Sequence, residues 1–278
     1  MAPLTNHRGT QGGQTTTMDI SFELTQQQKG NLRRIRALRD IPFHRVRKGD
    51  LGGWVASTHT TNGEPRIASN AWLGGEAELH DDASLRDSAL MKGYATARDH
   101  AVIAGGATVR GEAVIGENAQ VRGRACVQGK ARVFGDAIVT GRAHVFGAVK
   151  VYGFTTIGES ARVFGNADLD GPRIMGCARV WNNALISGDV TISGHGQVTK
   201  QNHYLAIHNC AAVTAGLITV YPNRSDETVF HFSNAEHSVA ELEELRQKYE
   251  TAQDTRALAQ QVQGMLQFVR SCAIDWGK

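Results

Sequence analysis

Apolar residues recur at every sixth position through the middle of the chain. The series begins at Ile67 and runs unbroken to Leu169. It slips by one residue within LDGPR, residues 169–173, and then resumes at Ile174 and ends at Val198. Four positions after each apolar residue lies a small one, Ala in most units; the exceptions include Val149, Thr155, Val190 and Gly196.

A second regularity lies two positions after each apolar residue. This position holds Gly or a residue that tolerates left-handed backbone angles, such as Asp81, Asp87, Asp99 or Asn182. A position that repeatedly requires positive φ indicates a corner. An α-helix would need a spacing near 3.6 residues, and a flat strand would alternate without a Gly at every sixth place. We therefore expect short strands that turn the same way at each corner.

The repeat predicts a parallel β-helix over residues 67–198. Three units make one triangular coil of about 18 residues. Because stacked coils lie about one strand spacing apart, near 4.8 Å, this segment gives about seven coils and a prism roughly 33 Å long. The large apolar residue points inward at the middle of each face, and the small one points inward near the next corner, where little more than Ala fits.

The motif of an aliphatic residue, two or three turn-permissive positions and a small residue resembles the hexapeptide repeat of left-handed parallel β-helix proteins. The resemblance covers residues 67–198 and implies left-handed coils, whereas crossovers between parallel strands are usually right-handed. Upstream, IRALRD at 35–40 and GDLGGWV at 49–55 resemble the N-terminal segment of a group of hexapeptide-repeat proteins from phages, prophages and enteric bacteria. That group implies a phage or prophage setting rather than a reaction.

Both flanks of the repeat lack its period. Residues 1–17 are polar and rich in Gly and Thr, which predicts a disordered leader. Residues 18–66 contain strand-like stretches around Ile35 and Trp54 with a turn at KGDLGG, and we expect a small β cap that covers the first coil, because exposed strand edges invite aggregation.

Residues 199–278 predict an α/β cap or an oligomerisation element. ITVYPN and TVFHFS read as a hairpin whose turn is NRSDE. Ser238 and Glu241 form a capping box before a helix over VAELEELRQKY, and a second helix is expected over residues 255–274. These helices could alternatively form an arm that binds a partner.

Composition bears on the corners of the repeat, on the cellular compartment and on membrane interaction. The chain has 31 Gly and 5 Pro, in keeping with a corner in every unit. The four cysteines form no CxxC pair and follow no secretory signal, which predicts a reducing, cytoplasmic compartment; they are Cys126, Cys177, Cys210 and Cys272. No apolar run approaches the roughly 18 residues needed to cross a bilayer, so no membrane interaction is expected.

The register assigns outward charges to the faces of the prism. The face that starts at Ile67 is predicted to be basic and carries Arg86, Arg122, Arg124, Arg142, His144, Arg162 and Arg179, with Asp87 and Glu159 at corners as its only acids. The face that starts at Leu79 is predicted to be acidic and carries Asp81, Asp82, Asp99, Glu117, Asp136, Asp170 and Asp189. One interpretation is a homo-oligomer, most simply a trimer, in which the basic face of one subunit meets the acidic face of the next.

Two further interpretations concern the same charges. Four arginines in successive coils predict an arginine ladder suited to phosphates or an anionic polymer; they are Arg124, Arg142, Arg162 and Arg179. Alternatively, the charges form a solvated surface.

Aromatic residues occupy corresponding outward positions on the remaining face. Phe146, Phe164 and Trp181 stand in three consecutive coils, with Phe134 and Tyr152 on the neighbouring face. Stacked outward aromatics usually have a partner. The C-terminal helices or another subunit could cover this aromatic ladder; alternatively, it stacks on bases or on a nucleotide ligand.

Candidate catalytic and metal residues are few. His144 lies between Cys126 and Arg162 in one outward column, and in hexapeptide acyltransferases a His between subunits acts as general base while coenzyme A lies along the prism. No acceptor-binding loop interrupts the coils here, and a lone outward His also fits a plain surface residue. The spacings of four C-terminal histidines match no zinc site, so no metal is expected; they are His203, His208, His231 and His237.

These patterns favour a non-enzymatic, oligomeric β-helical scaffold or binding protein of phage or prophage type. It needs no cofactor, and its partner is a host macromolecule, such as a protein, or an anionic or nucleotide ligand. The alternative is a coenzyme A-dependent acyltransferase with His144 as base at a subunit interface.

Overall fold

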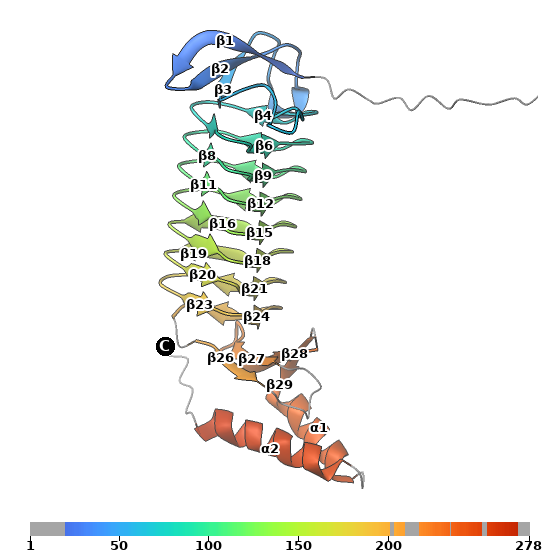
Figure 1. Ribbon diagram of the computed structural model, residues 1–278. Coiled ribbons are helices and arrows are strands. Elements are labelled where there is room, and N and C mark those ends of the chain that lie inside the picture. Colours follow the sequence, from blue (N-terminus) through green and yellow to red (C-terminus); the bar gives the residue numbers. More distant parts are fainter. Residues whose placement is uncertain (1–19, 201–202, 209–216, 234, 252–254, 272–278) are drawn as a thin grey trace, which may run out of the picture.

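The computed structural model describes residues 20–200, 203–208, 217–233, 235–251 and 255–271. Within them the chain forms an elongated three-sided coil, with antiparallel strands at one end and a sheet and two helices at the other (Figure 1). The predicted fold class is confirmed, because the protein is mainly β with a parallel β-helix of about seven turns. The expectation for residues 1–17 lies outside the described residues.

Each face of the coil is a sheet, and within the coils its strands are parallel and mostly two residues long. The ten-stranded sheet contains β1 (Phe22–Lys29), β2 (Leu32–Ala37), β3 (Leu51–Val55), β5 (Glu78–Leu79), β8 (Thr96–Ala97), β11 (Val114–Ile115), β14 (Arg132–Val133), β17 (Lys150–Tyr152), β20 (Asp168–Asp170) and β23 (Leu185–Ser187). The eight-stranded sheet contains β4 (Trp72–Leu73), β7 (Leu90–Met91), β10 (Thr108–Val109), β13 (Cys126–Val127), β16 (His144–Gly147), β19 (Arg162–Gly165), β22 (Arg179–Val180) and β25 (Gln197–Val198). The seven-stranded sheet contains β6 (Ser84–Leu85), β9 (Val102–Ile103), β12 (Gln120–Val121), β15 (Ile138–Val139), β18 (Thr156–Ile157), β21 (Arg173–Ile174) and β24 (Thr191–Ile192).

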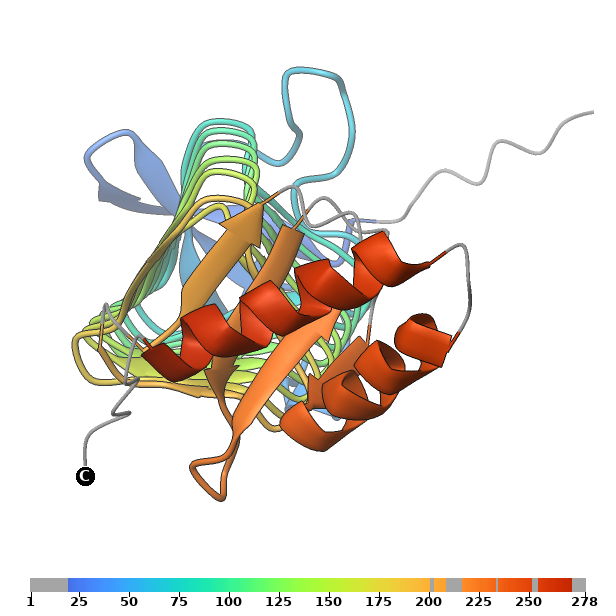
Figure 2. The same ribbon diagram turned by 90° about the horizontal axis from the view of Figure 1, so that it is seen from below.

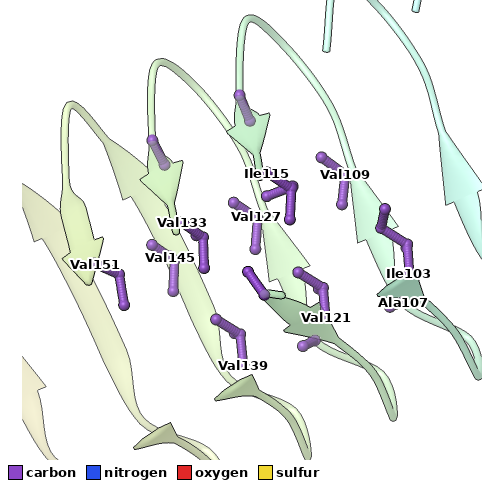
Figure 3. Packing of buried hydrophobic residues seen from close by; sticks show 14 of the residues in the cluster. Ile103, Ala107, Val109, Ile115, Val121, Val127, Val133, Val139, Val145 and Val151 are labelled. Atoms are coloured by element: carbon purple, nitrogen blue, oxygen red, sulfur yellow. The ribbon is translucent and has the colours of Figure 1, made fainter. Parts of the chain in front are cut away.

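The inward residues stack in register, as the repeat predicts. Val133 pairs with Val151, and Val151 pairs with Leu169 one coil further along. Figure 3 shows Val121, Val127 and Val133, one from each face, among the residues of this interior. All of these side chains are fully buried, so the core is a continuous column of aliphatic side chains with Ala near the corners.

Two exceptions at the small position have specific structural reasons. Thr155 lies before the one-residue slip, where its buried hydroxyl donates to the Tyr152 carbonyl at 2.6 Å and accepts from the Gly171 amide at 2.8 Å. Gly196 lies in the last coil, where a Cβ would come within 2.5 Å of the Tyr221 ring. The slip is therefore stabilised by a hydroxyl, and the last coil leaves room for a buried tyrosine.

Acidic residues at the corners bond to the backbone of the next coil. Asp81, Asp99 and Glu117 have positive φ values of 42°, 56° and 55°. The Asp81 carboxylate accepts from the Asp99 amide at 3.1 Å, and the Asp99 carboxylate accepts from the Glu117 amide at 2.9 Å. Part of the predicted acidic face therefore connects successive coils.

The N-terminal strands extend the ten-stranded sheet beyond the first coils. β1 and β2 form an antiparallel hairpin, β2 pairs antiparallel with β3, and β3 pairs in parallel with β5. A short 3₁₀ helix, η1 (Pro42–His44), lies between β2 and β3. Trp54 of β3 donates its indole N–H to Glu76 at 2.8 Å, and the Arg34 guanidinium lies 5.1 Å from the Trp54 ring centre.

The predicted C-terminal hairpin and helices are present. The hairpin belongs to a four-stranded antiparallel sheet of β26 (Leu205–His208), β27 (Leu217–Pro222), β28 (Thr228–Phe232) and β29 (Ala235–Ser238). The helices are α1 (Val239–Thr251) and α2 (Arg256–Ser271). Tyr221 and Val229 of this terminal sheet join the core of the coil, whereas Val220 and Phe230 pack with the helices. The sheet thus closes the end of the prism and the helices cover the sheet (Figure 2).

The predicted capping box at the start of α1 is also present. The Glu241 carboxylate accepts from the Ser238 amide at 2.6 Å, and the Ser238 hydroxyl accepts from the Glu241 amide at 3.1 Å. The bond from the Ser238 amide lowers the pKa of Glu241. The ionised carboxylate therefore contributes stability above its unfolded pKa, and this contribution is lost as the pH falls through the lowered folded pKa.

We expect Ser238→Ala to cost about 1 kcal/mol of local stability, because one amide at the helix N-terminus loses its acceptor. Hydrogen exchange should be faster in the first turn of α1 and unchanged in the coils. Exchange rates in α1 that match those of the unsubstituted chain would show that the box contributes no stability. A matched Ser225→Ala change in the β27–β28 turn, whose hydroxyl is not part of the box, should leave α1 unaffected.

Candidate basic and aromatic interaction face

The structure corrects the face assigned to three residues of the predicted basic face. His144, Arg162 and Arg179 begin β16, β19 and β22, so they lie on the eight-stranded sheet and not on the face that starts at Ile67. The physical reason is that the corner falls two positions after each inward aliphatic residue. The last residue of each six-residue unit has already passed this corner and belongs to the next face.

The arginine ladder consequently divides into two columns. Arg162 and Arg179 are direct neighbours in the parallel register of β19 and β22, and His144 precedes them in the same column. Arg124 and Arg142 lie two residues before Cys126 and His144, which pair in register, so these two arginines stand one above the other at the turn that leads into the sheet. The four arginines therefore approach the same sheet from two adjacent columns.

The aromatic ladder lies on that same sheet. Phe146 pairs with Phe164 in register, and their ring centres are 4.9 Å apart with the planes at 1°. Phe164 and Trp181 continue the stack at 5.7 Å and 5°. Since residues two apart on a strand point to the same side, the aromatic column stands directly beside the column of His144, Arg162 and Arg179. On the neighbouring sheet, Phe134 and Tyr152 also stack, at 6.2 Å and 18°.

We call this surface the basic–aromatic face and define it by seven residues. They are Arg124, Arg142, Arg162, Arg179, Phe146, Phe164 and Trp181. Three of the arginines are exposed, and Arg179 and the three aromatic residues are half-buried. Sequence reasoning identified all seven but placed them on two faces; the strand register brings them together.

The four arginines of this face form no ion pair with the described residues, although Glu159 stands at the corner beside Arg142. Elsewhere on the coils, basic side chains do pair with acids: Lys150 lies 3.4 Å from Asp168, and Arg86 lies 3.1 Å from Glu64. Arg162 and Arg179 instead occupy adjacent strands about 4.8 Å apart, where like charges repel. A bound anion would relieve this repulsion.

Charge also changes along the axis of the prism. Residues 67–120 contain eight Asp/Glu and four Lys/Arg, whereas residues 121–156 contain one Asp/Glu and six Lys/Arg. The segment 121–156 spans the coils that carry Arg124, Arg142 and Phe146. The coils of residues 121–156 therefore form a basic band that follows the more acidic coils of residues 67–120.

The described C-terminal helices do not provide the predicted cover for the aromatic ladder. Leu242, Val262 and Leu266 of the two helices pack with the terminal sheet in a hydrophobic cluster of their own. Phe146, Phe164 and Trp181 belong neither to that cluster nor to the core of the coil. Within the part of the chain that the structure describes, the aromatic edges face outward.

The histidines that the sequence offered as catalytic or metal-binding candidates do not form a common site among the described residues. His144 is exposed between Cys126 and Arg162, and it forms no side-chain hydrogen bond to the described residues. Among the described residues, no group of three or more His, Cys, Asp or Glu is placed to hold a metal ion. His231 pairs with Glu236 and His237 with Phe230 across β28 and β29, which puts the two histidines on opposite faces of the terminal sheet. His203 bonds to Thr199, and the side chain of His208 lies outside the described residues.

The remaining predictions concern the cysteines and a membrane-spanning helix. Cys126 and Cys177 are free thiols, and Cys210 and Cys272 lie outside the described residues. No helix in the described ranges has the length and apolar character needed to span a bilayer.

No protein-family model matches the chain, and no curated protein matches it. The function must therefore be argued from the geometry of the site.

Proposed function

We propose that the protein is a non-enzymatic β-helical binding scaffold whose basic–aromatic face holds an acidic protein surface. The observation that carries this proposal is the juxtaposition of two columns on one sheet: stacked arginines that form no ion pair with the described residues, and a half-buried aromatic strip beside them. An acidic protein patch with apolar residues at its centre would meet both columns at once.

The geometry of the aromatic ladder favours a protein over a nucleic acid. The rings of Phe146, Phe164 and Trp181 stack on one another at 4.9 Å and 5.7 Å, so the inner ring faces are already occupied. Bases bind by stacking on free aromatic faces. Ring edges instead form a narrow apolar strip, which suits packing against side chains of a partner.

A second copy of the chain, aligned in parallel, would supply few carboxylates to Arg124 and Arg142. In a threefold assembly whose axis runs along the prism, equal coils stand at equal height. Within residues 121–156, which carry Arg124 and Arg142, such a copy offers only Asp136 as a carboxylate, and Glu117 and Glu159 lie just outside this segment. Assembly into trimers stays a prediction, and in such a trimer a different molecule would still have to neutralise the basic band.

Binding of acidic polypeptides tests the proposal directly. We expect fluorescence anisotropy to detect binding of a labelled glutamate–tyrosine copolymer at low ionic strength and weaker binding as salt is added. The double change Arg162→Gln and Arg179→Gln should weaken this binding about tenfold or more, which corresponds to about 1.4 kcal/mol. Phe164→Ala should remove the preference for the copolymer over polyglutamate of the same length.

The matched control also removes two charges, by Arg47→Gln and Arg132→Gln, because both side chains are exposed, form no ion pair within the described residues and lie outside the basic–aromatic face. Equal losses in the control and the double variant would show that only net charge matters and would contradict a defined face. Tighter binding of oligothymidylate than of the copolymer would favour nucleic acid. Turnover of acetyl-coenzyme A that His144→Ala abolishes would overturn the non-enzymatic part of the proposal.

The predicted phage or prophage setting, in which the partner is a host macromolecule, is part of this proposal. Its support is the resemblance of the N-terminal segment, residues 35–40 and 49–55, together with the uninterrupted coil. A scaffold of this kind presents side chains at fixed intervals without a reaction centre.

A further inference from the structure

A cleft of about 660 Å³ lies where the terminal sheet meets the last coils of the seven-stranded sheet. Its volume is in the usual range of small-molecule sites. Residues from β18, β21 and β24 line one side, and His231, Ala235 and Glu236 of the terminal sheet line the other. The cleft is on a different sheet from the basic–aromatic face and shares no residue with it.

The wall formed by the coils is a column of hydrogen-bonding side chains. Thr156, Arg173 and Thr191 are neighbours in the parallel register of β18, β21 and β24. Ser193 and Met175 lie on the same wall two residues after Thr191 and Arg173. The wall thus offers three hydroxyls, one guanidinium and one apolar thioether.

The opposite wall is held in place by a buried tyrosine. Tyr221, fully buried at the end of the coil, donates from its hydroxyl to Glu236 at 3.0 Å and accepts from the Ser193 amide at 3.0 Å. Glu236 and His231 form a cross-strand pair, so both side chains project from the same face of the terminal sheet. The two walls are therefore joined at a fixed separation by the Tyr221 hydroxyl.

The polar groups of the cleft retain free hydrogen-bonding capacity. Glu159 uses one carboxylate oxygen to accept from the Gly176 amide at 2.7 Å, and Glu236 uses one for Tyr221. Arg173 forms no ion pair and His231 no side-chain hydrogen bond among the described residues, although His231 is only 8% exposed. Burial lowers the pKa of His231, so its imidazole is neutral near pH 7 and offers one donor and one acceptor.

We propose that this cleft binds a neutral carbohydrate. Two carboxylates that accept from hydroxyls, a guanidinium that donates, three side-chain hydroxyls and a neutral imidazole are complementary to a ligand with several adjacent hydroxyl groups. The two carboxylates outweigh the one guanidinium, which disfavours a phosphate or another anion. Met175 supplies an apolar surface for the carbon atoms of a sugar ring.

Saturation-transfer NMR on the full chain tests this site with a panel of neutral monosaccharides and disaccharides. We expect at least one sugar to give saturation transfer, and we expect Arg173→Ala and Glu236→Gln each to weaken its binding about tenfold. Glu236→Gln keeps an acceptor for the Tyr221 hydroxyl, so it tests the carboxylate without removing the anchor.

Gln120→Ala is the matched control, because Gln120 occupies the same outward column on β12, outside the residues that line the cleft. Its sugar binding should equal that of the unsubstituted chain, as should that of the variant in which Arg162 and Arg179 are replaced by Gln. Absence of transfer from every sugar would overturn the proposal. Undiminished binding in Arg173→Ala, or tighter binding of sugar phosphates than of the neutral sugars, would also overturn it.

Discussion

Val133→Asp should unfold several coils around the substitution. Val133 is fully buried in the aliphatic column, between Ile115 and Val151 in the parallel register of the ten-stranded sheet. A carboxylate there has no partner and no water, so the expected loss is at least about 4 kcal/mol. Because each coil is stabilised mainly by its two neighbours, the damage should spread along the axis.

The matched control is Arg132→Asp, the adjacent residue of β14, whose side chain is exposed. It introduces the same carboxylate on the outside of the coil and should change the melting temperature little. Hydrogen exchange should show protection lost in β11, β14 and β17 of Val133→Asp only. Cooperative unfolding at the same temperature in both variants would contradict an inward position for residue 133.

Gly123→Ala should also destabilise the coil strongly. Gly123 stands at a corner with φ of 70°, and an added Cβ would lie 2.9 Å from both the amide nitrogen and the carbonyl oxygen of Gly141. The left-handed backbone costs about 1–2 kcal/mol for a residue with a side chain. The close contact is with backbone of the next coil, which cannot rotate away, so we expect about 3 kcal/mol in total from urea denaturation.

Gly188→Ala separates the two contributions. Its φ of 81° is also left-handed, but nothing lies within 4 Å of an added Cβ. This variant should lose only the conformational share, about 1 kcal/mol. Equal losses at positions 123 and 188 would mean that the spacing between coils accommodates a methyl group at the corner.

The repeat made the interior of this fold predictable because each inward position is filled by one class of residue, a large aliphatic residue at mid-face and usually Ala near the corner. Val133, Val151 and Leu169 stack as their spacing indicates, and the slip at 169–173 is a local adjustment. The corner acids were predicted only to tolerate positive φ. Their second role, in which Asp99 accepts the Glu117 amide of the next coil, depends on the vertical spacing of the coils, which a sequence read in one dimension does not display.

The face to which each outward residue belongs was harder to predict than the positions of the inward residues. Arg162 lies one position before an inward Val, and the face to which it belongs depends on which side of the corner it stands. The positive φ at Glu159 locates that corner three residues earlier. If each six-residue unit is taken to start at the corner instead of at the aliphatic residue, the sequence alone places Arg162 beside Phe164.

The carbohydrate cleft had no comparable signal. Arg173 and His231 come from segments that differ in period and are far apart along the chain, and their meeting depends on how the terminal sheet docks. Gly196, one of the exceptions at a position where Ala is usual, marks this junction in the structure. The space that an Ala side chain would fill at residue 196 is occupied by the Tyr221 ring, which positions the terminal sheet against the last coil.

The stacking of near-identical coils also makes the length of the molecule adjustable in whole steps. Removal of one full turn between β7 and β13 would shorten the distance from the N-terminal hairpin to the cleft at the terminal sheet, and the retained strands would still meet partners of the same kind. Related chains could therefore change reach by gaining or losing turns while both ends stay intact. The number of turns therefore sets the length of the molecule, and selection can act on it separately from the cleft at the C-terminal end of the coil.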